Sequence, residues 1–173
     1  MRYLTLIIII MLFGCKTQKL QLETVNQLDL KKYTGTWYEI ARLPNSFEKG
    51  LKCTTANYSI NDDGSIKVVN KGHKTDEPDK VKQSTGKALV PDKAEPGKLK
   101  VSFQWPFYGK YWVLKLDPEY KHVLVGTPSG KYLWLLSRNP DMDDREMLEY
   151  VEYAKSKGFN IQNLIYVAQD CNP

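Results

Sequence analysis

Three cysteines and two histidines are the residues most able to do chemistry in this chain. Cys15 follows an apolar run, Cys53 lies in an early strand-like segment, and Cys171 is close to the end of the chain. His73 and His122 have no serine or cysteine motif beside them. The chain also lacks an H-E-x-x-H sequence, a nucleophile elbow and a glycine-rich phosphate loop. The sequence therefore predicts neither catalysis nor a bound metal or cofactor.

The first 14 residues have the composition of an export signal. Arg2 supplies a positive charge, and the apolar run 4–13 is too short to cross the ~30 Å hydrocarbon core as a helix. Leu12-Phe13-Gly14-Cys15 resembles the lipobox of bacterial lipoproteins, in which the cysteine is acylated after cleavage. We expect residues 1–14 to be a signal peptide and residues 15–27 a lipidated tether. Several acyl chains on Cys15 would hold the protein firmly at the outer membrane, exposed to the periplasm. An uncleaved anchor or an ordinary secretory signal is the alternative.

Cys53 and Cys171 remain once Cys15 carries lipid. Two cysteines in an exported, oxidising compartment most simply form one disulfide. The alternative is a nucleophilic Cys53 thiolate, which would make the protein an enzyme.

The charge pattern argues against nucleic-acid binding. The formal net charge is +5, and lysines are interspersed with acidic residues along the chain instead of forming a basic stripe.

Turn residues divide the chain into short strands. Leu99, Val101 and Phe103 alternate with polar residues, which is the pattern of a strand with one buried face. Helical patterns do not occur between the strands, so the sequence predicts an all-β, eight-stranded antiparallel up-and-down barrel. One amphipathic helix, from about 141 to 157, is expected to pack outside it, and a last strand is expected at 163–168. The eight strands are expected at 36–43, 52–60, 65–70, 81–90, 98–104, 111–116, 122–126 and 132–137.

Several segments carry a family resemblance. Gly35-Thr36-Trp37 resembles the G-x-W signature of the lipocalins, and about a hundred residues later a strand ends in Ser137-Arg138, followed by a helix. Asn57-Tyr58-Ser59 and Pro106-Phe107-Tyr108-Gly109 also resemble the branch that contains bacterial lipocalins and apolipoprotein D. The resemblance implies a lipocalin domain over residues 28–173, barrel closure by Gly35, Trp37 and Arg138, and a Trp37–Arg138 cation–π pair. It further implies a fatty acid or lysophospholipid as ligand and a possible homodimer.

The inward faces of the strands predict the lining of the ligand site. Counting from an inward Trp37 gives a long, apolar and aromatic wall suited to an acyl chain. Lys115 or Arg42 could meet a carboxylate or phosphate, and the loop Trp105–Tyr108 would lie at the open mouth. A barrel filled by side chains, in a structural or interaction lipoprotein, is the alternative. The predicted lining residues are Ala41, Ala56, Tyr58, Val68, Val101, Phe103, Tyr111, Val113, Leu124, Trp134 and Leu136.

Overall fold

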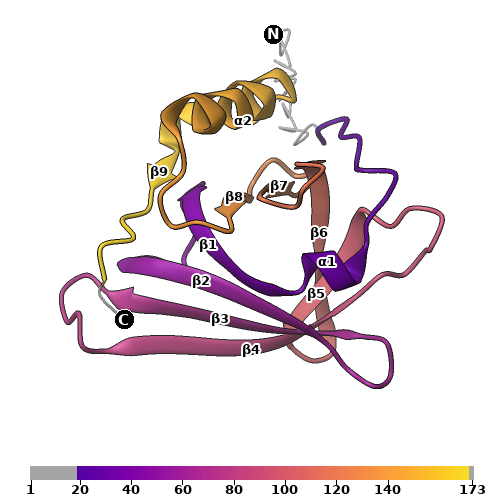
Figure 1. The fold of residues 1–173 in the computed structure, drawn as a ribbon, viewed down its shortest axis with the longest axis horizontal. Coiled ribbons are helices and arrows are strands. Elements are labelled where there is room, and N and C mark those ends of the chain that lie inside the picture. Colours follow the sequence, from indigo (N-terminus) through magenta and orange to yellow (C-terminus); the bar gives the residue numbers. More distant parts are fainter. Residues whose placement is uncertain (1–18, 172–173) are drawn as a thin grey trace, which may run out of the picture.

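The computed structural model describes residues 19–171, so the predicted signal peptide and Cys15 lie outside the described residues. The described chain forms a closed antiparallel barrel with one long helix on its outside (Figure 1). Within these residues no helix is long and apolar enough to cross a membrane. The barrel strands are β1 (Gly35–Arg42), β2 (Leu51–Ile60), β3 (Ile66–Lys74), β4 (Val81–Leu89), β5 (Lys98–Gln104), β6 (Phe107–Leu116), β7 (His122–Gly126) and β8 (Leu133–Ser137).

Each strand pairs with the next, and β1 closes the barrel. The first half of β1 pairs with β2, and the second half pairs with β8. A further short strand, β9 (Ile165–Tyr166), joins the outer edge of β1 after the 3₁₀ turn η1 (Ile161–Asn163). The eight predicted strands and the up-and-down order are confirmed. The last strand, predicted at 163–168, is limited to Ile165–Tyr166: residue 163 belongs to η1, and residues 164, 167 and 168 lie outside the strand.

The short helix α1 (Leu30–Tyr33) closes one end of the barrel together with Arg138. Arg138 lies 3.8 Å above the ring centroid of Trp37, which is fully buried, so the predicted cation–π pair is confirmed. The guanidinium also donates hydrogen bonds to four backbone carbonyls of this segment, those of residues 32, 33, 34 and 36, at 2.7, 3.1, 2.8 and 2.8 Å. Arg138 therefore fastens the α1–β1 segment across the closed end.

The long helix α2 (Asp144–Ser156) covers the outer wall of β7 and β8 (Figure 1). Asp143 caps it by accepting a hydrogen bond from the backbone N–H of Arg145 at 2.9 Å. Tyr150, Val151 and Ala154 form its buried face. This confirms the predicted outer helix.

Two predicted lining residues, Leu124 and Ala41, instead belong to this outer cluster. Val123 lies opposite the inward Leu136, and residues opposite each other share a face, so the next residue, Leu124, points outward. Ala41 is displaced by a bulge in β1 between residues 39 and 41, after which Arg42, opposite Trp134, takes the inward position. Both predictions were wrong because a one-residue shift of phase exchanges the two faces of a strand.

A disulfide joins Cys53 to Cys171, with the two sulfur atoms 2.06 Å apart. The backbone N–H of Cys53 donates to the carbonyl of Ala168 at 2.8 Å, so the carboxyl tail lies along the start of β2. The predicted pairing is confirmed. The alternative of a Cys53 thiolate is wrong, because its sulfur is held in the disulfide.

Candidate ligand site

The barrel encloses a cavity of about 660 Å³, a volume within the usual range for small-molecule pockets. The alternative of a barrel filled by side chains is therefore wrong. Eight of the predicted residues line the cavity: Ala56, Tyr58, Val68, Val101, Phe103, Tyr111, Trp134 and Leu136.

The deep wall of the cavity is apolar. Leu99, predicted on the same inward face as Val101 and Phe103, lines it together with Ala88, which was not predicted, and both are almost fully buried. Val113 points inward as predicted but belongs to the core around Trp37 below the cavity, so it does not line the cavity. The lower part of the cavity can therefore accept a hydrocarbon chain without burying an unpaired polar group.

Three tyrosine hydroxyls meet at the floor. The Tyr111 hydroxyl lies 2.7 Å from that of Tyr33 and 2.9 Å from that of Tyr58. Burial raises the pKa of Tyr58 to about 12 and the pKa values of Tyr33 and Tyr111 well above their ordinary range. The three tyrosines are therefore neutral hydrogen-bonding groups that largely satisfy one another.

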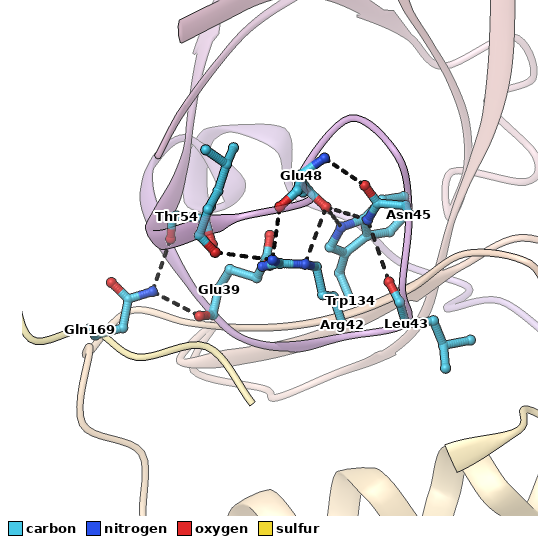
Figure 2. Close-up of polar contacts among 9 residues, drawn as sticks. Glu39, Arg42, Leu43, Asn45, Glu48, Thr54, Trp134 and Gln169 are labelled. Carbon is cyan, nitrogen blue, oxygen red and sulfur yellow. Dashed lines mark hydrogen bonds and ion pairs between the residues drawn. The ribbon is translucent and has the colours of Figure 1, made fainter. Parts of the chain in front are cut away.

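One side wall carries a buried ionic cluster of Glu39, Arg42 and Glu48 (Figure 2). Arg42 Nη1 donates to Glu39 Oε1 at 2.5 Å, and its Nε lies 3.9 Å from Glu48 Oε2. Glu48 Oε2 also accepts hydrogen bonds from Asn45 Nδ2 at 2.5 Å and from Trp134 Nε1 at 3.1 Å. Glu39 and Glu48 line the cavity, whereas Arg42 stands behind them.

Burial, more than any neighbouring charge, sets the protonation of Glu39. Together with the neighbouring Glu48 it raises the pKa of Glu39 to about 8, although Arg42 opposes this rise. Glu39 is therefore mostly protonated near neutral pH. The side wall then presents a hydrogen-bond donor and one carboxylate to the cavity.

Sequence reasoning missed this cluster in part. Glu39 lies two residues after Trp37, so strand alternation predicts it on the inward face, whereas Arg42 was expected only as a charge that could meet a ligand near a strand end. Glu48 lies in the β1–β2 loop, where strand alternation gives no signal. The β1 bulge, which has no sequence signature here, brings Arg42 inside.

The open end of the cavity is basic and aromatic. Lys71, Lys82 and Lys110 contribute to its lining together with Phe47 and Phe107. Lys82 Nζ donates to the carbonyl of Phe47 at 2.7 Å, which places this ammonium across the mouth.

Lys115 lies elsewhere. Its Nζ is 2.5 Å from Glu149 on α2 and stands over the ring of Tyr150, outside the barrel. The expectation that Lys115 could meet a ligand is therefore wrong.

Comparison with known proteins identifies the family of this chain. The family model for the lipocalin-like domain matches residues 28–169. The chain is 47% identical over 145 residues to the outer membrane lipoprotein Blc of Escherichia coli K12, covering 84% of this chain and 81% of that protein. The protein of the same name from Vibrio cholerae is 42% identical over 161 residues, covering 92% and 94% of the two chains. Apolipoprotein D of Rattus norvegicus is 39% identical over 133 residues, covering 72% and 68%.

Solved structures agree on the fold. Insecticyanin from the tobacco hornworm Manduca sexta superposes with a TM-score of 0.67 at 23% identity, covering 85% of this chain and 84% of the insecticyanin chain. The barrel, the Trp37–Arg138 closure, the outer helix and the relatives agree: this chain belongs to the lipocalin family, as a bacterial lipocalin of the outer membrane lipoprotein type.

Proposed function

We propose that the cavity holds the acyl chain of a fatty acid or lysophospholipid, with the polar head at the open end. This proposal rests on the change in the cavity lining from apolar at the deep end to basic at the mouth. The deep wall is apolar around Val68, Leu99 and Val101, whereas Lys82 lies at the mouth. A single-chain amphiphile matches both ends of such a site.

The ionic cluster supports this orientation of the ligand. A carboxylate or phosphate placed beside Glu39 and Glu48 would be repelled by Glu48, while the Arg42 donors are already engaged with Glu39 and with backbone carbonyls. An anionic head is better placed near Lys82, where water also solvates it.

The cellular role that fits such a site is storage, transport or maintenance of membrane lipids in the envelope. In this proposal acylated Cys15 anchors the protein, since the relatives from Escherichia coli and Vibrio cholerae are named outer membrane lipoproteins. Homodimer formation stays a prediction.

The test is native mass spectrometry of the purified protein after delipidation and incubation with a mixed membrane-lipid extract. We expect one fatty acid or lysophospholipid to be retained per barrel. The variant Val101→Trp, which fills the cavity, should lower retention roughly tenfold, because the chain and the indole compete for the same volume.

Lys100→Trp is the matched control, because residue 100 is the next position on β5 and is exposed on the other face. It should retain lipid like the parent. A folded parent protein that retains no lipid would contradict the proposal, as would equal retention by the two variants.

A further inference from the structure

Exposed apolar side chains gather at the open end of the barrel. Ten large apolar residues among those described are exposed, and six of them lie at this end. Trp105 is 82% exposed and Phe107 is 73% exposed, both at the turn between β5 and β6. Such a concentration of apolar surface at one end marks an interaction site. The six residues are Phe47, Val81, Phe103, Trp105, Phe107 and Tyr108.

The β5–β6 hairpin projects beyond the neighbouring strand β7 at the open end. Trp112 of β6 pairs with Gly126, the last residue of β7, yet β6 begins five residues earlier, at Phe107. Five residues of strand extend about 17 Å. The hairpin tip, residues 103–108, therefore reaches well past the end of β7.

The amino-terminal segment leaves the barrel at the same end. The backbone N–H of Leu20 donates to the carbonyl of Pro128 at 2.8 Å, and the Leu20 side chain lies against Gly130. Both contacts are with the β7–β8 loop, at the opposite end from Arg138. Cys15 precedes Leu20 by five residues, which can span at most about 18 Å. An acyl chain on Cys15 therefore keeps the start of the described chain at the open end within about 18 Å of the membrane. This distance is similar to the extension of the β5–β6 hairpin past β7.

The loops of the open end carry an excess of positive charge. Asp76, Glu77 and Asp79 lie in the β3–β4 loop, where Glu77 pairs with Lys74 and Lys80. Glu48 is buried. More lysines than acids remain at this end, which favours an anionic surface as the partner. The lysines of these loops and strand ends are Lys49, Lys71, Lys74, Lys80, Lys82, Lys110 and Lys131.

We propose that the β5–β6 hairpin tip, Phe103–Tyr108, docks on the anionic phospholipid bilayer in which Cys15 is anchored, so that the mouth of the cavity faces the membrane. The inference rests on the proposed acylation of Cys15. An aromatic tip with a tryptophan suits the membrane interface, because indole and phenol rings combine apolar area with a polar group. Phe103 and Phe107 also line the cavity, so a lipid could pass from the bilayer to the cavity along one apolar surface.

The experiment measures the membrane contact of two positions in the acylated full-length protein. The protein is reconstituted in vesicles of phosphatidylethanolamine and phosphatidylglycerol. A polarity-sensitive fluorophore is attached to Trp105→Cys or, as the matched control, to Lys93→Cys, which is exposed in the β4–β5 loop at the closed end. Cys53 and Cys171 are in a disulfide and Cys15 is acylated, so the introduced thiol is the one that reacts.

We expect spin-labelled phospholipids to quench the probe at position 105 by roughly twofold or more, with little effect at position 93. Equal, weak quenching at both positions in membrane-bound protein would overturn the docking proposal and leave the anchor intact. Protein that does not fractionate with the vesicles would contradict the anchor, and with it the docking proposal. Efficient disulfide cross-linking between two unlabelled Trp105→Cys chains, with no quenching by lipid, would assign this surface to a second copy instead.

Discussion

Burial of Glu39 beside Glu48 makes the free energy of unfolding depend on pH. The carboxyl group has a pKa of about 8 in the folded protein and its ordinary value of 4.5 when unfolded. Between these values the folded state binds more protons, so stability decreases as pH rises. The full contribution is present below about pH 4.5 and is lost above about pH 8.

The substitution Glu39→Gln should remove this dependence, because the amide keeps a hydrogen-bond acceptor for Arg42 but does not ionise. We expect the variant to gain stability relative to the parent between pH 5 and pH 9, by at least about 1.4 kcal/mol, the equivalent of one pKa unit. Urea unfolding at the two pH values measures the difference.

Glu149→Gln is the control for this prediction, since Glu149 is an exposed acid on α2 that pairs with Lys115. It should show no comparable gain with rising pH. If Glu39→Gln behaved like this control, the raised pKa of Glu39 would be wrong.

At the scale of elements, the residues that pack α2 on the barrel contribute to stability and are different from those that line the cavity. Leu124 of β7 is 1% exposed and belongs to the cluster of residues beneath α2, not to the cavity wall. Its side chain therefore contributes to the packing of the helix on the barrel, while the ligand site lies on the other side of the same strand.

Leu124→Ala should destabilise the protein by about 2–4 kcal/mol, the usual cost of removing a buried leucine side chain. Lipid retention at temperatures well below unfolding should be unchanged. Thermal unfolding and native mass spectrometry check the two effects. Leu148→Ala, at an exposed position of α2, should change stability by no more than about 0.5 kcal/mol. Loss of bound lipid in a folded Leu124→Ala variant would contradict this prediction, because it would indicate that Leu124 lines the cavity.

The elements themselves were largely predictable, with exceptions that have physical reasons. Strands β5 and β7 have the predicted bounds, because turn residues flank them on both sides. Strand β3 runs four residues further than expected, to Lys74, since its polar end at the open rim shows no apolar alternation. Helix α1 was not predicted, because four residues are too few to show helical periodicity.

For the whole molecule, the disulfide is a long-range constraint. It joins positions separated by 118 residues and holds the carboxyl tail against β2. The tail is also held by Gln169, whose Nε2 donates to the carbonyls of Glu39 and Thr54 at 2.8 and 3.0 Å. Closure of so long a loop restricts mainly the unfolded chain.

Reduction of the disulfide should therefore lower the free energy of unfolding by up to about 4–5 kcal/mol in the chain-entropy model. Urea unfolding with and without a reductant measures this loss. Cys171→Ser should be less stable than the oxidised parent and insensitive to the reductant. A parent protein whose unfolding midpoint does not change on complete reduction would show that the tail contacts alone hold this end.

The sequence by itself determined the fold class, the outer helix, the pairing of Cys53 with Cys171, and the closure by Trp37 and Arg138. Turn residues, period-two alternation and family motifs are local signals that one chain carries. Only the tertiary structure decided that Arg42 points inward, that Leu124 and Ala41 point outward, and that Glu48 joins the cavity wall. A bulge or a one-residue shift in phase reverses the faces of a strand without changing its composition, and a loop residue such as Glu48 has no phase until the barrel closes around it.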